Sequence, residues 1–202
     1  MKTHYQRRLP HILPTGAIIF FTFRLADCLP AALMQQLAEE QKLALQAAAE
    51  LPEQQTAAIA AVKKRQFAKF DTLLDQAAYG PDWLAQPAIA YLVAEETRRL
   101  AELEVVVLAY CLMVNHVHLV VQLPDTPTFS VAQMMQRLKG RTAVAANKLL
   151  GRQGQAFWQR ESYDHVVRDG KELERIIAYI LNNPVKAGLV DEWTKWPHSY
   201  VG

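Results

Sequence analysis

The chain of 202 residues contains only two cysteines, Cys28 and Cys111, and this scarcity excludes a protein held together by a disulfide framework. Both cysteines lie in or beside strongly apolar segments. We therefore expect two buried, reduced thiols in a cytosolic protein rather than a disulfide. With 51% hydrophobic and 21% charged residues, the sequence also excludes wholesale disorder and indicates a packed globular protein.

Long hydrophobic runs are also missing. The two longest cover residues 17–23 and 105–114, far short of the roughly 20 residues that a membrane-spanning helix requires. Residues 1–8 are followed by Pro10 and Pro14 rather than by an apolar run with a small-residue cleavage site. We therefore expect neither a membrane span nor a secretory signal, and the length predicts one domain, with or without a large insertion.

The chain has no strong excess of either charge, since its net charge is only +2. The charge is nevertheless uneven: residues 1–30 carry +3 and residues 131–202 carry +4, whereas residues 31–110 carry −4 and residues 111–130 carry −1. This asymmetry is compatible with a polyanion that both ends bind together, although solvated surface charge is the commoner explanation.

The first half of the chain predicts one strand followed by helices. Residues 17–25 are rich in β-branched and aromatic residues and follow a turn sequence, which predicts a strand. Residues 31–50 and 53–77 are rich in Ala, Gln, Glu and Leu, which favour a helical hairpin interrupted near Pro52. A further helix is expected over residues 88–101.

The second half predicts a strand hairpin and two more helices. Residues 104–113 and 116–123 have the composition of strands, and the short link between them favours antiparallel pairing. The remaining expected elements are a helix over 130–150, a short strand over 163–168 and a helix from 171 to about 183. This order predicts an α+β fold: a mainly antiparallel sheet with helices packed on it, and a helical insertion over about 31–101.

Two histidines stand out on the second strand of the hairpin. His116 and His118 are two positions apart, so both imidazoles project to the same face of the sheet and can bind one divalent cation. Alone, this pair is a weak signal, because two structural or exposed histidines are the commoner explanation. No His/Cys spacing typical of zinc sites occurs in the chain.

Tyr179 and Asn183 share one face of the last helix because they are four residues apart. Alone, a core tyrosine and an asparagine that ends a helix before Pro184 are the commoner explanations. Together with the histidine pair they suggest chemistry, since a tyrosine of pKa near 10 attacks at neutral pH only a polarised target or after losing its proton. A cation bound by two histidines and one amide oxygen would polarise a phosphodiester, and tyrosine attack would be transesterification.

Several short segments also occur in a characteristic order. They are Met113-Val-Asn-His-Val-His118, Leu138-Lys-Gly140, Phe157-Trp-Gln159, Tyr163-Asp164, Arg168-Asp169 and Tyr179-Ile-Leu-Asn-Asn-Pro-Val-Lys-Ala-Gly-Leu-Val190. With these segments the chain resembles the REP-associated tyrosine transposases, a branch of the single-tyrosine HUH transposases, over about residues 17–196. The resemblance implies a ferredoxin-like or RRM-like core. The helical region 31–77 is longer than in compact single-tyrosine transposases.

The resemblance also implies roles for four residues. His116 and His118 match the metal ligands, Tyr179 matches the nucleophile and Asn183 matches the third ligand. The family uses Mg²⁺ or Mn²⁺, cuts single-stranded DNA near hairpins formed by repetitive extragenic palindromes (REP), and leaves a 5′ phosphotyrosine. Relatives are monomers or homodimers. One departure is Val114, where the family usually has proline, which changes the turn into the strand.

Candidate DNA contacts follow from charge and position. Arg160, Arg168 and Lys186 are close in sequence to the predicted catalytic helix and are the better candidates. Basic residues spread around the preceding helix are further candidates: Arg137, Lys139, Arg141 and Lys148. Trp158 could stack on an unpaired base, although packing in the core is an equal alternative.

Three functions remain open. The first is an active metal-dependent DNA endonuclease and strand transferase, a transposase acting at REP-type hairpins. The second is a domesticated protein that binds structured single-stranded DNA without cutting it. The third, a two-histidine phosphoesterase, would need two His-x-Thr/Ser motifs, and His4 and His11 offer no second copy of the single motif around His116.

Overall fold

The computed structural model describes residues 14–50 and 54–202, which form two compact units. Residues 14–26 and 82–202 make up the sheet unit, and residues 27–81 make up the helical unit. No helix in these two described ranges is long and apolar enough to cross a membrane. Cys28 and Cys111 are both buried, reduced thiols, as predicted.

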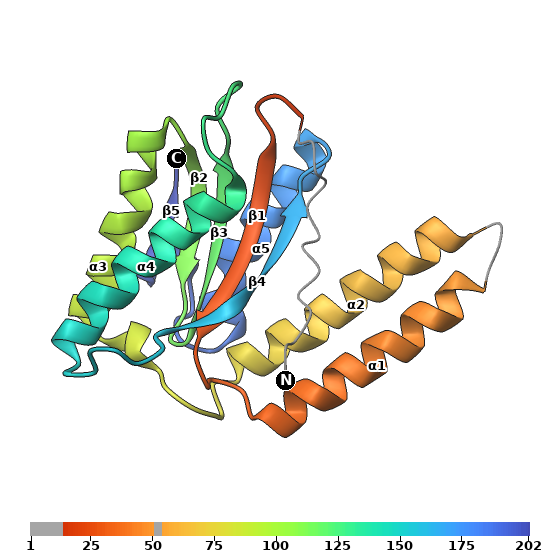
Figure 1. The fold of residues 1–202 in the computed structure, drawn as a ribbon, viewed down its shortest axis with the longest axis horizontal. Coiled ribbons are helices and arrows are strands. Elements are labelled where there is room, and N and C mark those ends of the chain that lie inside the picture. Colours follow the sequence, from red (N-terminus) through yellow and green to blue (C-terminus); the bar gives the residue numbers. More distant parts are fainter. Residues whose placement is uncertain (1–13, 51–53) are drawn as a thin grey trace. The chain divides into compact units, whose positions relative to one another are not determined.

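The sheet unit is built on five strands in the order β4-β1-β3-β2-β5, and every neighbouring pair is antiparallel (Figure 1). The strands are β1 (Ile18–Leu25), β2 (Val106–Leu112), β3 (His116–Gln122), β4 (Trp158–Val166) and β5 (Ser199–Val201). The prediction of an α+β fold with an antiparallel sheet is confirmed. The order of the first four strands, with helices in the β1–β2 and β3–β4 connections, is that of the ferredoxin-like fold.

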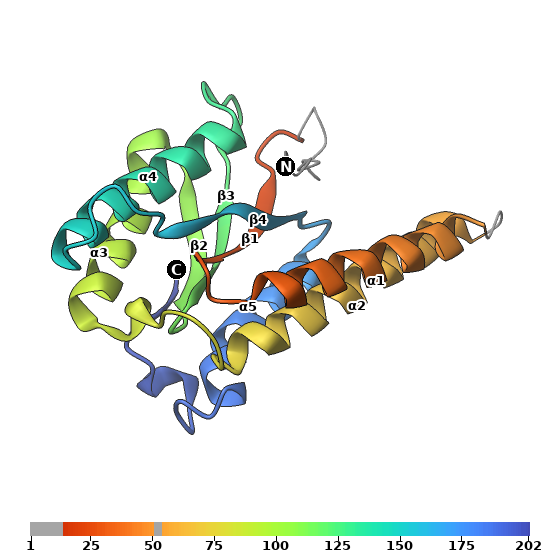
Figure 2. The ribbon, with the colours of Figure 1, turned by 60° about the horizontal axis from the view of Figure 1, so that its bottom comes forward.

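Helices cover both faces of this sheet. They are α3 (Pro87–Arg98), α4 (Val131–Leu149) and α5 (Gly170–Lys186), with short 3₁₀ helices at Trp83–Ala85, Arg99–Leu103 and Trp193–Lys195. α3 and α4 lie together on one face and α5 lies on the other (Figures 1 and 2). Because β3 is central and covered on both sides, nearly all of its residues are buried, including its two histidines.

Local sequence signals fix the ends of the helices. Ser130 and Gln133 form a capping box at the start of α4, and the Asp169 side chain caps α5 by accepting a hydrogen bond from the Glu172 amide. Beyond the end of α5, Gly188 has a φ of 69°, which allows the amides of residues 188 and 189 to bond back to the last turn of the helix.

Two predicted boundaries in the second half were wrong, and one strand was not predicted. α5 continues to Lys186 with Pro184 inside it, because a proline near the helix end removes only one backbone hydrogen bond. β4 begins at Trp158 rather than at residue 163, since a polar edge strand carries no apolar run that reveals its start. Residues 199–201, for which no strand was predicted, form β5 along β2.

The helical unit contains α1 (Ala31–Ala49) and α2 (Gln55–Asp75), which pack against each other as the predicted hairpin. Lys69 of α2 forms an ion pair with Glu40 of α1. The break predicted near Pro52 lies outside the described residues. The insertion is shorter than the predicted 31–101, because α3 packs on α4 and belongs to the sheet unit.

Candidate active site

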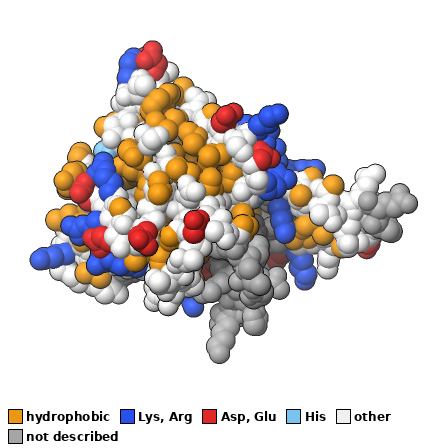
Figure 3. All heavy atoms as spheres, turned by 90° about the horizontal axis from the view of Figure 1, so that it is seen from above, with side chains coloured by type: hydrophobic (Ala, Val, Ile, Leu, Met, Phe, Trp, Pro, Cys, Tyr) orange, Lys and Arg blue, Asp and Glu red, His pale blue; other side chains and the backbone are white. Residues whose placement is uncertain are grey.

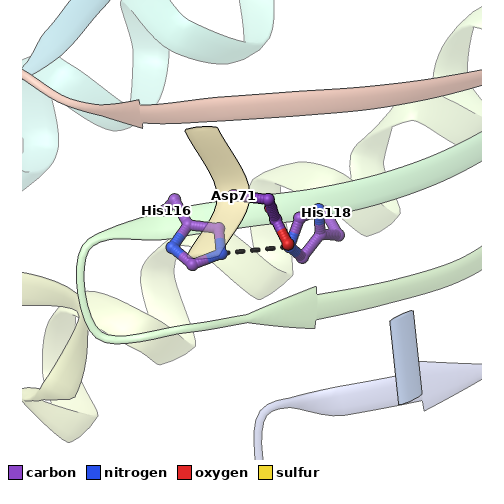
Figure 4. A group of neighbouring side chains, drawn as sticks. All are labelled: Asp71, His116 and His118. Carbon is purple, nitrogen blue, oxygen red and sulfur yellow. Dashed lines mark hydrogen bonds between the residues drawn. The ribbon is translucent and has the colours of Figure 1, made fainter. Parts of the chain in front are cut away.

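The two histidines of β3 converge on one point. His116 and His118 are both fully buried, and their Nε2 atoms lie 3.0 Å apart (Figure 4). At this separation both nitrogens can reach one cation with metal–nitrogen bonds of about 2.1 Å. At most one of them carries a proton in the absence of a cation, since they lie within hydrogen-bonding distance of each other. Asp71, also drawn in Figure 4, belongs to α2 of the helical unit.

Neighbouring residues hold the outer nitrogens of both rings. The Asn115 side-chain oxygen accepts a hydrogen bond of 2.7 Å from Nδ1 of His116. Nδ1 of His118 lies 2.8 Å from the hydroxyl oxygen of Thr22, which comes from β1. Such partners fix the ring orientation and leave the Nε2 lone pairs available, as metal-binding histidines require. Sequence reasoning missed Thr22 because only the β1–β3 register brings it opposite His118.

The environment keeps His118 neutral. Burial lowers the pKa of His118 to about 3, and the positive charge of Lys186 acts in the same direction. A histidine must be deprotonated at the nitrogen that binds a metal. The site therefore has this imidazole ready as a ligand at neutral pH.

Tyr179 of α5 lies beside this pair. Its ring is edge-on to the ring of His118, with the two centroids 5.8 Å apart. The side chain is only partly buried, and the Lys186 Nζ lies 6.0 Å from the centre of its ring. The structure thus places the phenol ring of a helix beside one of two paired imidazoles on a strand.

Asn183, one helical turn beyond Tyr179, is fully buried. Within the described part of the chain, neither its side-chain oxygen nor its side-chain nitrogen has a hydrogen-bond partner. Leaving a buried amide without a partner costs about 1–3 kcal/mol, so such a group needs a functional reason. Two imidazole nitrogens and one amide oxygen are a donor set that suits a divalent cation, and the residues present therefore fit a metal.

A cluster around Glu172 fixes the beginning of α5. The Arg168 guanidinium donates two hydrogen bonds to this carboxylate, at 3.0 and 2.7 Å, and the Arg168 amide donates a third. Nε2 of His165 lies 3.2 Å from the same carboxylate. These contacts, led by the hydrogen bond from Arg168, hold the pKa of Glu172 at about 2. The cluster joins the end of β4 to the helix that carries Tyr179.

We expect Glu172→Gln to lower the thermal midpoint by about 2–4 °C at pH 7, corresponding to roughly 1 kcal/mol. The folded-state pKa lies below the ordinary value of 4.5, so this stabilisation is complete above pH 4.5 and is lost as the pH falls toward 2. Thermal melts at pH 7 and pH 3 should therefore show a smaller difference at the lower pH. Glu174→Gln, an exposed change in the same helix, is the control, and equal midpoints at pH 7 for Glu172→Gln would contradict the assignment.

Three of the predicted DNA-binding residues form ion pairs within the protein. Arg137 and Arg141 of α4 pair with Glu102, and Arg141 also lies 3.6 Å from Glu96, on the face of the sheet opposite Tyr179. Arg168 is exposed but directs its guanidinium to Glu172. The pairs made by Arg137 and Arg141 could not be seen in the sequence, because their partners Glu96 and Glu102 are far away along the chain.

Lys139 and Trp158 support the fold. The Lys139 ammonium donates to the carbonyls of Gln159 and Arg160 and to the Ser162 hydroxyl, which ties α4 to β4. Burial lowers its pKa to about 8, opposed by Glu161 and assisted by Arg24. Trp158 is buried and its indole nitrogen donates to Thr142 of α4. Trp158 is therefore a core residue, which was the alternative to stacking on a base.

Arg160 of β4 and Lys186 of α5 remain exposed, as does Lys148 of α4. On the face drawn in Figure 3, hydrophobic side chains occupy the middle, and Lys and Arg are interspersed with Asp and Glu along the borders. Positive charge thus does not cover that face continuously. The face therefore offers a polyanion single basic residues rather than a broad basic patch.

The candidate site lies in a part of the chain that is similar in sequence to known proteins. Residues 92–183 match the family model of IS200-like transposases, and this range contains the two histidines, Tyr179 and Asn183. Over 98 residues the chain is 30% identical to a Haemophilus influenzae protein named as a REP-associated tyrosine transposase. That alignment covers 45% of this chain and 56% of the relative, so the match spans just over half of the relative's length.

A solved structure shares the fold. It is the structure of a REP-associated tyrosine transposase bound to a REP hairpin, and it aligns with a TM-score of 0.54 at 17% sequence identity. The alignment covers 98% of this chain and 82% of that one. This alignment shows that the two chains share a fold. The resemblance that the ordered motifs indicated is supported by the family model and the sequence relative.

Proposed function

We propose, because this chain is related to the REP-associated tyrosine transposases, that it cuts and rejoins single-stranded DNA at REP-type hairpins through Tyr179. The observation that carries the proposal is the position of the Tyr179 ring, 5.8 Å from the ring of His118, on the helix that also carries the buried Asn183 amide. The hairpin as partner is supported by the solved relative that holds one.

The reaction would be a transfer between two hydroxyl groups. The Tyr179 oxygen forms a bond to phosphorus while the bond from phosphorus to the 3′ oxygen breaks, which leaves a 5′ phosphotyrosine and a free 3′ hydroxyl. The phenol loses its proton and the departing 3′ oxygen gains one. Because the bond energy is kept in the phosphotyrosine, a 3′ hydroxyl can attack it later and rejoin the strand.

His116, His118 and Asn183 would hold Mg²⁺ or Mn²⁺. The cation would act as a Lewis acid on the phosphate oxygens. Thr22 and Asn115 orient the two imidazoles, as their hydrogen bonds show.

Exposed basic residues would hold the DNA backbone. Lys186 lies on the same helix as Tyr179, with its ammonium 6.0 Å from the tyrosine ring, and Arg160 is exposed on β4. Each could pair with a phosphate and position the strand, without reading its sequence.

The test uses a single-stranded hairpin from the repeats that flank the gene, labelled at its 5′ or 3′ end, with Mg²⁺, Mn²⁺ or a chelator. Denaturing electrophoresis should show a metal-dependent DNA–protein adduct that carries only the 3′ label, because a 5′ phosphotyrosine retains the downstream fragment. A complex that shifts in native gels without cleavage under any metal would instead favour the domesticated binding protein. The phosphoesterase has no support, and His4 and His11 lie outside the described residues.

A further inference from the structure

Arg24 lies next to the histidine pair in the sheet. In the antiparallel pairing of β1 with β3, Thr22 is opposite His118 and Arg24 is opposite His116. Residues directly opposite each other in an antiparallel pair project to the same face. The hydrogen bond between Thr22 and His118 confirms this face for Thr22, and Arg24, two residues later, shares it.

Arg24 is also buried and placed at an irregular point of the sheet. Only 6% of its surface is exposed, which is unusual for an arginine. The pairing of β1 with β4 shifts register between Phe23 and Leu25, the stretch that contains Arg24. Such irregularities redirect side chains and are common beside active sites.

An acidic residue lies close enough to Arg24 for the two charges to interact. It is Glu161 of β4, in the stretch between Trp158 and Ser162 where the register with β1 shifts. Burial acts to raise the pKa of Glu161, but hydrogen bonds from Gln159 and the backbone, with the charges of Arg24 and Lys139, lower it overall. Glu161 is therefore ionised near neutral pH and can orient the guanidinium.

A buried arginine is poorly explained by stability alone. Removing its charge from water is costly, and a well-packed apolar side chain would often stabilise the sheet as much. A guanidinium instead offers five donors in a planar fork that matches the oxygens of a phosphate. We propose that Arg24 binds the non-bridging oxygens of the scissile phosphodiester and stabilises the negative charge that grows there as Tyr179 attacks, with Glu161 orienting it. This inference rests on the proposed function.

The experiment compares the wild type with Arg24→Lys and Arg24→Ala. It measures the single-turnover rate of adduct formation at saturating hairpin, together with hairpin affinity and the thermal midpoint. We expect Arg24→Ala to lower the rate about 100-fold, as loss of a group that stabilises transition-state charge does. Arg24→Lys should lower it about tenfold, because an ammonium lacks the planar fork. Hairpin affinity should change less than about threefold, since many phosphate contacts share it.

Guanidinium ion, added well below denaturing concentrations, should restore part of the rate of Arg24→Ala. Arg175→Ala, an exposed change on α5, is the matched control. A rate for Arg24→Ala within about threefold of the wild type would overturn the proposal, because a lost charge contact costs far more. A lower thermal midpoint with no rescue by guanidinium would overturn it too, by making the role structural. If the wild type forms no adduct, the proposed function itself fails, and the inference fails with it.

Discussion

Tyr179→Phe should abolish the covalent DNA–protein adduct, with a loss of at least about 1,000-fold, because it removes the only oxygen of the nucleophile. Phenylalanine keeps the ring that packs edge-on against His118, so the fold and the metal site should survive. Hairpin affinity should stay within about threefold of the wild type, since phosphate contacts by basic residues carry most of the binding. Denaturing gels with a labelled hairpin measure the adduct, and native gels measure binding.

Tyr163→Phe is the matched control. Tyr163 comes from β4 and lies on the same face of the sheet, in the row that contains Thr22 and His118. Its hydroxyl has no role in the proposed reaction, so this variant should still form the adduct. An adduct that persists in Tyr179→Phe and disappears in Tyr163→Phe would reassign the nucleophile.

A second large effect is expected at Asn183, where a substitution should lower adduct formation without lowering the thermal midpoint. Asn183→Leu replaces a buried amide that lacks hydrogen-bond partners in the described structure with an apolar side chain of similar size. Such a change is neutral or stabilising for a fold, because the penalty for an unsatisfied buried polar group disappears. We therefore expect an equal or higher thermal midpoint without metal. Adduct formation should fall at least about 100-fold, since one ligand of the cation is lost.

Metal binding provides an independent test of whether Asn183 is a ligand of the cation. A cation that binds the folded state raises the thermal midpoint with its concentration, so Mn²⁺ should stabilise the wild type. Asn183→Leu should show a much smaller shift, whereas Asn182→Leu, the exposed neighbour, should behave like the wild type. An unchanged Mn²⁺ shift in Asn183→Leu would remove Asn183 from the metal site.

The features that the sequence predicted depend on short-range periodicity. The spacing of two along a strand placed His116 and His118 on one face, and the structure joins their Nε2 atoms within 3.0 Å. The spacing of four along a helix placed Tyr179 and Asn183 together on α5. These relations hold within one element and need no knowledge of the tertiary fold.

The features that the sequence did not predict depend on pairing between distant segments. Thr22 supports His118 across 96 residues of chain, and the Arg24–His116 pair follows from the same strand register. β5 is three residues long and gains its structure from β2. No local pattern specifies such partners, because they are set by which strands become neighbours.

The positions of basic residues in the sequence did not reveal their ion pairs. Arg137 and Arg141, which are predicted phosphate contacts, pair with carboxylates from the region of α3. Lys139 is directed to carbonyls of β4. Whether a basic side chain faces solvent or an acidic neighbour depends on packing, so a count of lysine and arginine along a helix cannot separate the two.

The central claim is that Tyr179 carries the DNA after cleavage. The most direct measurement isolates the adduct, digests its DNA and its protein, and maps the modified residue by tandem mass spectrometry. The account predicts a nucleotide attached through its 5′ phosphate to the oxygen of Tyr179 in a peptide of α5, formed only with a divalent metal. Attachment to another residue, or cleavage with no protein-bound nucleotide, would contradict it.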